Sequence, residues 1–292
     1  MGRGCEGAVR WSGVRRAVRK RTAVRPGGLS GRDSRTGTTA PSDWTLAPSP
    51  HRPLGPYVMR SRIYQPEIMD EETLDQDTVD EIYRYLASVN HYLGGVNATI
   101  ARFEAFSRTW RAGERIEVLE IACGAADVPK ALITWGRSRG FDLRVTATDI
   151  LTSALDYARR VPPVDERLRL VGADVERLPF RDQTFDYVTC ALFFHHLIDA
   201  QIISALKAFD RLATRGIVVN DLVRSRRAYV WTWLFTKPFH PILHHDGPLS
   251  IRRSLKPDEM QHLASAAGLP WLTVQRHFGH RMTLAGQKNQ RT

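Results

Sequence analysis

An apolar strand that runs straight into a turn of small residues constrains this chain more than any other feature. Residues 117–127 read E-V-L-E-I-A-C-G-A-A-D, and a second predicted strand, 144–149, ends on Asp149. A third apolar segment, 168–175, reaches Asp174. Such a turn lets backbone approach a ligand, and an acid at the tip of the next strand accepts hydrogen bonds from ribose hydroxyls. The spacing therefore predicts a Rossmann-like sheet that binds a nucleoside.

The composition of the turn indicates which kind of nucleoside the sheet binds. A dinucleotide site needs G-x-G-x-x-G so that a pyrophosphate can reach a helix N-terminus. Here Gly124 is the single glycine, Ala122 and Ala126 hold the other small positions, and Glu120 precedes them. A carboxylate repels a pyrophosphate but attracts a cationic amino group. We expect both alanines to keep a negative φ, because a methyl group fits wherever φ is negative.

Glu120, Ala122, Gly124 and Ala126 resemble the first motif, acid-x-G-x-G-x-G, of the class I S-adenosylmethionine-dependent methyltransferases, with alanine at two glycine positions. The segment R-L-P-F-R-D-Q-T-F-D-Y-V-T-C-A-L-F-F-H-H-L-I at 177–198 is similar to the ubiquinone- and menaquinone-type small-molecule methyltransferases. This resemblance implies an α/β fold: a mostly parallel Rossmann-like sheet with helices on both faces, an antiparallel C-terminal hairpin and an N-terminal helical cap.

The same resemblance implies S-adenosylmethionine as the cofactor. Glu120 is expected to contact the amino group of the cofactor, Asp149 its ribose hydroxyls, and Asp174 its adenine amine. Glu120 and Asp174 also have an alternative role, since each could cap the helix that follows it. The complete predicted cofactor set is Glu120, Ala122, Cys123, Gly124, Ala126, Asp149, Ile150, Asp174, Val175 and Ala191.

The positive charge of the chain is concentrated in its first 58 residues. That segment holds eleven Arg and Lys against three acids, so it carries +8 of the formal net charge of +11. It is rich in Gly, Pro, Ser and Thr without an apolar period, which predicts disorder. A targeting peptide, a basic arm and translation from a start codon upstream of Met59 are the alternatives, and we favour the last. Nucleic-acid binding is therefore not expected of the folded body.

The rest of the composition narrows the class of protein. The sequence has no apolar run of the 18 residues or more that a membrane span requires. Cys5, Cys123 and Cys190 lack the spacing of a metal site, and Cys123 and Cys190 fall in predicted core positions. We therefore interpret the chain as a reduced, cytoplasmic protein without a bound metal.

Hydrophobic periodicity predicts a helical cap over 59–112 with helices at 71–93 and about 96–110. In the core, 113–292, strands alternate with helices, which indicates a parallel sheet covered on both faces. The predicted elements are strand 116–121, helix 127–138, strand 143–148, helix 152–160, strand 168–172, strand 185–191, helix 200–212 and strand 216–220. Two last strands, 269–277 and 280–285, are expected to form a hairpin at the sheet edge.

An aromatic-rich insertion, 221–256, lies between the predicted strand 216–220 and the predicted C-terminal hairpin. Residues 229–239 contain one tyrosine, two tryptophans and two phenylalanines. That density suits a lid over an apolar aromatic substrate. The competing interpretation, which we favour for most of these residues, is an amphipathic helix packed on the sheet edge. Arg224 and its neighbours Arg226 and Arg227 are expected to be solvated.

His195 and His196 follow the predicted strand 185–191 at its carboxyl end, where open α/β sheets place their ligands. A neutral imidazole suits removal of a phenol or enol proton, so both are candidate catalytic residues. The alternation of side chains along a strand places only one of them toward the cleft. The other is expected to be structural.

A second group of residues is assigned to the methyl acceptor. The resemblance implies that Asn220 and Asp221 face it, and Tyr92 in the cap is expected to close the site from above. The H-H-D run at 244–246 looks like a metal cluster, but sequential histidines on a proline-flanked loop seldom share one metal. We therefore assign His245 to a lid or substrate contact.

These features predict methyl transfer from S-adenosylmethionine to a small molecule of secondary metabolism: a phenolic, quinone-precursor or polyketide-type hydroxyl or carbon. The alternative enzyme is an RNA, DNA or protein methyltransferase. The sequence argues against it, because T-C-A-L-F-F-H-H stands where amino-group methylation uses an N-P-P-Y-like tetrapeptide. A binding or scaffold protein that keeps the fold without turnover is the alternative of a different class.

Overall fold

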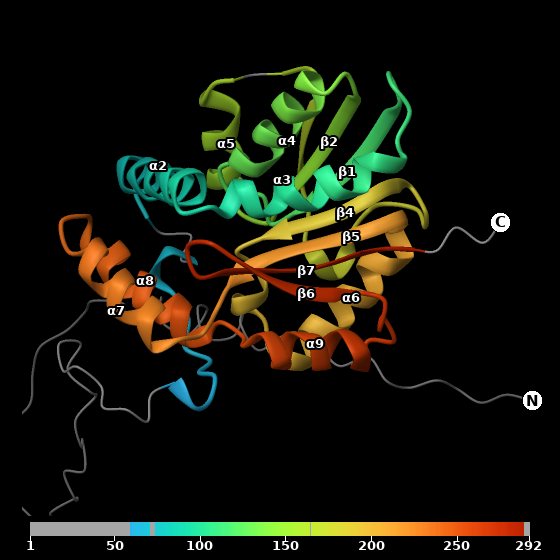
Figure 1. Cartoon of the computed structure of the whole chain (residues 1–292). Helices are drawn as coiled ribbons and strands as arrows, with labels where there is room; N and C mark the ends of the chain where they lie inside the picture. The colour runs from blue at the N-terminus through green and yellow to red at the C-terminus, as the bar shows by residue number, and fades with distance from the viewer. Residues whose placement is uncertain (1–58, 71–73, 164, 289–292) are drawn as a thin grey trace, which may run out of the picture. The chain divides into compact units, whose positions relative to one another are not determined.

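The computed structural model describes residues 59–70, 74–163 and 165–288, so the predicted disordered extension 1–58 lies outside the described residues. The described strands form one sheet in the order β3-β2-β1-β4-β5-β7-β6 (Figure 1). Neighbours from β3 to β5 are parallel, whereas β5–β7 and β6–β7 are antiparallel. The strands are β1 (Arg115–Ile121), β2 (Asp142–Asp149), β3 (Leu168–Gly172), β4 (Phe185–Ala191), β5 (Ala213–Leu222), β6 (Thr273–His277) and β7 (Arg281–Gln287). The predicted mostly parallel sheet with an antiparallel C-terminal hairpin is confirmed.

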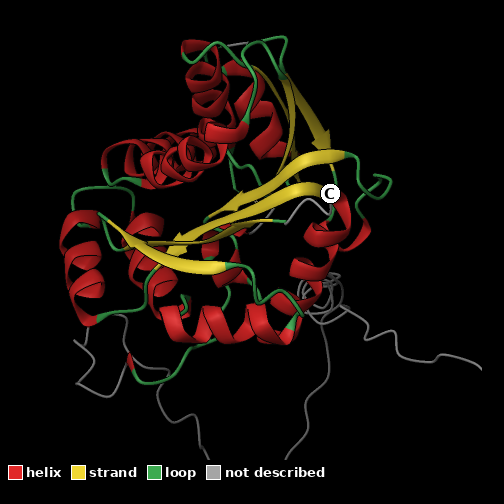
Figure 2. Cartoon of the chain, turned by 45° about the vertical axis from the view of Figure 1, so that its right-hand side comes forward, coloured by secondary structure: helices red, strands yellow, loops and turns green. Residues whose placement is uncertain are grey.

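Helices cover both faces of this sheet, as Figures 1 and 2 show. One face packs against α3 (Gly95–Phe106), α4 (Asp127–Ser138) and α5 (Thr152–Arg160). The other face packs against α6 (Asp199–Leu212) and α9 (Pro257–Ala266). The predicted bounds of α4 and α5 are confirmed to the residue, because strong apolar periods and short turns delimit both helices.

The cap helix α2 (Gln76–Tyr92) lies against α3, α4 and α5. It begins later than predicted because Asp75 caps it, accepting a hydrogen bond from the Thr78 N–H at 2.9 Å. At the other end Gly94 takes a φ of +80°, which turns the chain directly into α3. The described chain also contains short 3-10 turns: η2 (Ile68–Asp70) before α2, η3 (Ser107–Thr109) after α3, η4 (Val175–Arg177) after β3 and η5 (Phe194–His196) after β4.

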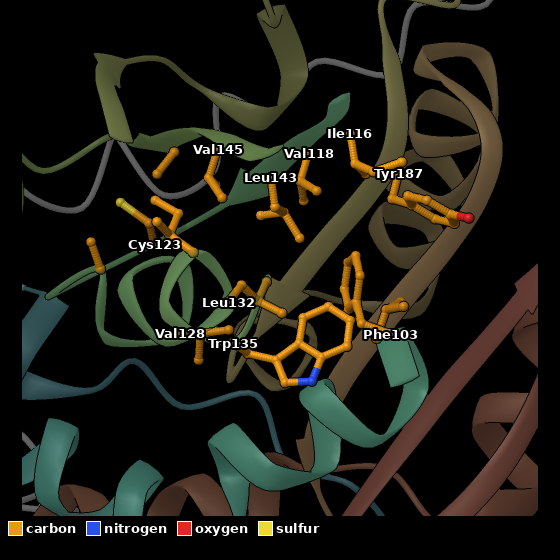
Figure 3. Close-up of a cluster of buried hydrophobic side chains, with 14 of the residues drawn as sticks. Phe103, Ile116, Val118, Cys123, Val128, Leu132, Trp135, Leu143, Val145 and Tyr187 are labelled. Atoms are coloured by element: carbon orange, nitrogen blue, oxygen red, sulfur yellow. The ribbon is translucent and has the colours of Figure 1, made fainter. Parts of the chain in front are cut away.

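A buried aromatic cluster fixes α3 to the sheet (Figure 3). Tyr187 of β4 is fully buried, and its hydroxyl accepts a hydrogen bond from Trp110 Nε1 at 2.9 Å. Phe103 and Phe106 of α3 pack on the same ring, with centroids 5.5 Å away in both pairs. Aromatic side chains bury large apolar areas, so this contact is expected to contribute strongly to stability. It holds the cap over the middle strands of the sheet.

The predicted lid segment folds as two helices that pack on each other, α7 (Arg226–Thr236) and α8 (Pro241–Arg253). Three expectations for this segment are wrong. Residues 221–222 still belong to β5, and α7 packs chiefly on α8 rather than on the sheet edge. Arg224 is buried instead of solvated, because it donates hydrogen bonds to the Ser254 carbonyl and the Glu259 carboxylate.

The C-terminal hairpin is confirmed, with Gly279 and His280 at positive φ in its turn. Its first strand begins at Thr273 rather than at residue 269, because Leu272 N–H bonds the Leu269 carbonyl in a turn. Cys123 and Cys190 are buried, as expected. Among the described helices, none combines the length and the apolar character needed to cross a membrane.

Candidate active site

The turn after β1 adopts a glycine-like conformation without three glycines. Ala122, Gly124 and Ala126 have φ values of 54°, 51° and 55°, so the expectation of a negative φ at both alanines is wrong. The left-handed conformation costs an L-residue roughly 1–2 kcal/mol. Hydrogen bonds hold the turn in place, from Cys123 N to Thr148 O at 2.9 Å and from Ala126 N to Cys123 O at 2.8 Å. The two alanines therefore adopt the backbone conformation that glycine takes easily, and the turn from β1 into α4 carries backbone strain.

Asp149 is the last residue of β2, and its side chain contacts the turn after β1. Its Oδ2 accepts a hydrogen bond from Gly124 N at 2.8 Å, and its Oδ1 accepts one from Leu151 N at 2.9 Å. Burial raises the pKa of Asp149, and these backbone hydrogen bonds oppose that shift. A carboxylate oxygen can accept a second hydrogen bond, so both oxygens retain capacity for ribose hydroxyls.

Next to the turn, charged side chains of opposite sign are buried with unused hydrogen-bonding atoms. Glu120 Oε2 and Asp127 Oδ2 have no hydrogen-bond partner among the residues that the structure describes. The same is true of Nε and Nη1 of Arg281. Glu120 and Arg281 are each 1 % exposed. Buried polar atoms are nearly always paired in proteins, so orphaned acceptors and donors in one region indicate a place for a ligand.

Arg281 is a site residue that the sequence analysis missed. It is the first residue of β7, it pairs with Leu222 of β5, and its Nη2 donates to Asn90 Oδ1 of α2 at 2.9 Å. Burial lowers the pKa of Arg281 to about 10, against the charges of Asp221 and Asp127, which raise it. The available signal was a charged residue at the start of the apolar strand R-M-T-L-A-G.

Glu120 has the electrostatic environment of a receptor for a cation. Burial and the negative charge of Asp127 raise the pKa of Glu120 to about 8. Burial also raises the pKa of Asp127. A hydrogen bond from Asn90 and the charge of Arg281 only partly offset this shift of Asp127. An incoming ammonium group would stabilise the ionised form of both acids.

The remaining predicted cofactor residues follow the strand ends. Ile150, directly after β2, is 58 % exposed, and an apolar side chain there is available to a flat ring such as adenine. Asp174 caps the turn η4 by accepting from Glu176 N at 3.0 Å, so its alternative capping role is present in the structure. Val175 and Ala191 are half-buried at the ends of their segments. The contacts of all of these residues with the cofactor stay predictions.

His195 and His196 lie together on η5, beyond the end of β4. Their ring centroids are 4.3 Å apart. His195 is held by Asp221, whose Oδ1 lies 2.7 Å from Nδ1 and whose Oδ2 accepts from the His195 backbone N–H at 3.0 Å. Leu192, at a φ of +55°, ends the extended conformation before the histidines. A 3-10 turn has no strand alternation, so it does not direct the two rings to opposite sides, and which of them faces the acceptor stays a prediction.

The neutral state expected of the histidines does not hold for His196. Burial opposes its charge, but Glu67 and Asp70 together raise the pKa of His196 to about 9. Its Nδ1 lies 3.1 Å from Asp70 Oδ2. Glu67 and Asp70 come from the segment that precedes α2, which the sequence analysis did not assign to the site. The acids of P-E-I-M-D, at 66–70, were the only signal.

This N-terminal segment is tied to η5 and α8 by buried charges. Arg62 donates to the backbone carbonyls of Phe194 and Leu197 at 2.9 and 2.6 Å. Asp246 of α8 accepts from the backbone N–H groups of Ile68 and Met69 at 3.1 and 2.9 Å. The segment therefore packs over η5 and α8 beyond the carboxyl end of β4, where open α/β folds bind ligands. We call this region the acceptor side, because the sequence analysis assigns the methyl acceptor to it.

The predicted acceptor residues occupy different positions. Asn220 is fully buried, and its Nδ2 donates to Gly95 O and Thr99 Oγ1 of α3 at 2.6 and 2.9 Å, which ties β5 to α3. Its Oδ1 has no hydrogen-bond partner among the described residues. Tyr92 is 76 % exposed at the end of α2. His245 lies on α8 with its Nδ1 2.7 Å from Asp246 Oδ1. The structure brings Asp221 to His195 but does not join the other three to that pair.

Large apolar side chains are exposed near this closed region. The exposed set on and after α7 is Val230, Trp231, Trp233, Leu234, Phe235 and Phe239. Trp231 and Phe235 stack with ring centroids 5.1 Å apart, and Phe239 reaches Tyr85 of α2 at 4.6 Å. The second contact links the α7–α8 pair to the cap helix.

Comparisons with known proteins agree with this architecture. A family model described as a methyltransferase domain matches residues 118–216. Demethylmenaquinone methyltransferase of Staphylococcus epidermidis is 33 % identical over 110 residues, which cover 38 % of this chain and 44 % of that protein. The Staphylococcus aureus protein of the same name is 30 % identical over 111 residues, with the same shares. The matched segment therefore spans less than half the length of these relatives.

Solved structures share the fold at low sequence identity. Human N-acetylserotonin methyltransferase in complex with S-adenosylmethionine has a TM-score of 0.54 and 15 % identity, covering 73 % of this chain and 56 % of that one. An O-methyltransferase family 2 protein from Planctomyces limnophilus, in complex with apigenin, has a TM-score of 0.51 and 14 % identity, covering 74 % and 62 %. Both likenesses concern the architecture of the sheet and its helices.

Proposed function

We propose that this chain, which carries a class I methyltransferase domain, transfers a methyl group from S-adenosylmethionine to a small-molecule acceptor. The observation that carries the proposal is the group of three buried charged side chains with unpaired atoms beside the turn after β1, Glu120, Asp127 and Arg281. The family match over 118–216 and the strand order support the same cofactor. When bound, S-adenosylmethionine supplies a methyl group that is already activated by a positively charged sulfur.

The residues present fit the amino-acid end of this cofactor. A ligand ammonium would provide donors for Glu120 Oε2 and Asp127 Oδ2, and a ligand carboxylate would accept from Arg281 Nε or Nη1. These pairings would satisfy the orphaned atoms with groups of opposite charge. Asp149 and Ile150, at the next strand end, would then hold the ribose and the adenine.

The chain contributes alignment and exclusion of water on the acceptor side. The segment 59–70, η5 and α8 close that side through buried hydrogen bonds, which keeps bulk water away from the reacting groups. His195 and His196 are assigned to the acceptor, where His195 promotes loss of its proton. His196 is held beside Glu67 and Asp70, which raise its pKa, so it is assigned to orienting the acceptor rather than to removing its proton. Asp221 acts as a positioning residue, because it fixes the ring of His195.

The acceptor is proposed to be an apolar small molecule with a phenolic, quinone-precursor or polyketide-type hydroxyl or carbon. The exposed aromatic side chains of α7 support an apolar ligand. The names of the curated relative demethylmenaquinone methyltransferase and of the structurally similar N-acetylserotonin methyltransferase refer to small molecules, and the structurally similar protein from Planctomyces limnophilus was solved in complex with apigenin. The proposal places the reaction within secondary metabolism in the cytoplasm.

Calorimetry on the full chain tests the cofactor assignment with two ligands. S-adenosylhomocysteine carries the amino-acid group, and 5′-methylthioadenosine lacks it. Each hydrogen bond to a charged group contributes roughly 1.5–3 kcal/mol, so the first ligand should bind at least about tenfold more tightly. Arg281→Met should remove most of that difference and leave 5′-methylthioadenosine binding unchanged, while Arg281→Lys should retain part of it.

The outcomes separate the competing functions. If neither ligand binds at millimolar concentration, the scaffold interpretation replaces the enzyme. If both bind, methyl transfer to a panel of phenols and quinols is compared with transfer to RNA and to protein. Transfer to the macromolecules alone would overturn the small-molecule assignment.

A further inference from the structure

Three metal-ligating side chains converge on one buried point on the acceptor side. Glu67 Oε1 lies 3.9 Å from His195 Nε2, and Glu67 Oε2 lies 3.9 Å from His196 Nε2. One ligand atom from each residue can be chosen so that all lie within 4.8 Å of one another. These separations are too long for hydrogen bonds. Two nitrogens and a carboxylate therefore surround a gap that none of them closes.

The separations approach those around a small cation and require the ligands to move inward. Zinc lies about 2.0–2.2 Å from imidazole nitrogen and carboxylate oxygen, so two ligands in tetrahedral geometry are about 3.4 Å apart. The two contacts of Glu67 involve its two different oxygens and exceed this distance by about half an ångström. Rotation of the His196 side chain, which is 22 % exposed, can bring its Nε2 inward.

Both imidazoles are oriented as metal ligands usually are. His195 Nδ1 lies 2.7 Å from Asp221 Oδ1, and His196 Nδ1 lies 3.1 Å from Asp70 Oδ2. A carboxylate that accepts from Nδ1–H leaves the lone pair of a neutral imidazole on Nε2, and such outer partners accompany most metal-bound histidines. In both residues Nε2 is the atom that approaches Glu67. Two adjacent histidines that each have their own carboxylate go beyond what one general base requires.

The charges around the gap balance when a divalent cation is included. Glu67, Asp70 and Asp221 supply three negative charges, and Arg253 Nη1 lies 3.4 Å from Glu67 Oε1. The guanidinium neutralises one of the three. A divalent cation that takes the place of the proton on His196, which lies beside Glu67 and Asp70, neutralises the other two. This matters because the side chain of Glu67 is only 1 % exposed. Ser250 Oγ donates to Glu67 Oε1 at 2.9 Å and helps to fix the carboxylate.

We infer that Glu67, His195 and His196 form a binding site for a first-row divalent cation of the zinc type. Two imidazoles and one carboxylate suit Zn²⁺, Fe²⁺ or Co²⁺ better than Mg²⁺ or Ca²⁺, which prefer oxygen ligands. The three protein ligands leave a position for a further oxygen. If the proposed methyl transfer holds, that position receives the acceptor oxygen as its conjugate base, with the proton released to solvent on binding, because a cation lowers the pKa of a bound hydroxyl. In the metal-bound site the cation therefore replaces His195 as the group that promotes deprotonation. The site differs from the metal-free protein expected from the sequence.

Metal binding is measured on the full chain after treatment with a chelator. Calorimetry with Zn²⁺ should give one equivalent with a dissociation constant below about a micromolar, and Co²⁺ should give visible absorption bands typical of four or five ligands. Glu67→Gln and His196→Gln should each weaken Zn²⁺ binding at least about tenfold. His91→Gln, at an exposed histidine of α2, is the matched control and should leave binding unchanged.

Several outcomes would overturn the site. They are absence of Zn²⁺ and Co²⁺ binding to the folded chain, binding unaffected by both substitutions, or equal weakening by His91→Gln. If Glu67→Gln fails to fold, Asp70→Asn decides instead, because it keeps all three ligands but removes the outer partner of His196, which should weaken binding about tenfold or more. Zn²⁺ binding without cofactor binding would support the site and reject the proposed function, so the two failures are distinguishable.

Discussion

The cofactor side and the acceptor side of this sheet are built in opposite ways. On the cofactor side, Gly124 and Asp149 are 25 residues apart in the chain and meet through two consecutive strands. On the acceptor side, Arg62 bonds Leu197 across 135 residues, and Glu67 bonds Ser250 across 183. The first arrangement follows from the βαβ repeat, whereas the second exists only after distant segments have packed. A site made of local turns can be identified by its motif, but a site made of distant segments cannot.

The difference also appears in how charge is stabilised. Glu120 and Arg281 keep orphaned atoms, which suits a site completed by a ligand. On the acceptor side, His195 pairs with Asp221 and Arg253 Nε donates to the His195 carbonyl, so the two histidine-bearing elements are held by contacts within the chain. Among the described residues Arg253 Nη1 is the buried atom of this group that lacks a hydrogen-bond partner. We therefore expect substitutions on the two sides to separate cofactor binding from turnover.

The largest expected effect concerns His195. His195→Gln should lower turnover by roughly a hundredfold or more, because it removes the group assigned to the acceptor proton. The affinity for S-adenosylhomocysteine should stay unchanged, since the residue lies outside the predicted cofactor set. Steady-state kinetics and calorimetry on the same preparation measure both quantities. A turnover within a factor of about two of the parent would leave alignment alone as the source of the rate.

Asp149→Ala should give the reverse pattern. It removes an acceptor for ribose hydroxyls and also the partner of Gly124 N and Leu151 N. A lost hydrogen bond to a charged acceptor costs roughly 1.5–3 kcal/mol, so cofactor affinity should fall more than tenfold. Asp149→Asn keeps the shape and should lose less. An unchanged dissociation constant in a folded Asp149→Ala protein would refute the assignment of this strand end.

A smaller effect is expected from the strained turn. Ala122→Gly should raise the free energy of unfolding by up to about 1 kcal/mol, since the relief of left-handed strain exceeds the added entropy of glycine in the unfolded chain. Ala131→Gly is the matched control, because the same change inside α4 should lower stability by about 1 kcal/mol. Urea denaturation measures both. Equal destabilisation by the two substitutions would show that Ala122 carries no strain.

The smallest effect is a pH dependence at the contact of α2 with α5. A hydrogen bond from Arg160, opposed by partial burial, lowers the pKa of Asp80 to about 2. A carboxyl group with a lowered pKa stabilises the fold at pH values above its ordinary pKa of 3.8. That contribution is lost as the pH falls from there through about 2. Thermal unfolding between pH 5 and pH 2 should therefore be less pH-dependent in Asp80→Asn. A parallel decline in both proteins would assign the acid sensitivity to other carboxyl groups.

The amino-acid sequence alone determined the sheet and the first half of the site. Apolar runs separated by amphipathic helices indicated strands and crossovers, and the strand-end acids Glu120 and Asp149 followed directly from that reading. The φ values of Ala122 and Ala126 did not follow, because a motif reports residue size but not backbone conformation. Arg281 was missed because its partner Asn90 belongs to α2. In addition, β7 is antiparallel to β5, so the first residue of β7 lies beside the last residue of β5, Leu222, and no motif indicates this pairing.

Only the tertiary structure decided which polar groups meet on the acceptor side. His195 and His196 were recognised by position, but Glu67 and Asp70 belong to a segment with no motif and reach the histidines only when 59–70 folds over η5. The alternation of side chains along a strand could not predict the directions of the His195 and His196 rings, because the extended conformation ends at Leu192. Sequence patterns encode neighbours along one element, while a buried cluster of charges depends on how separate elements pack.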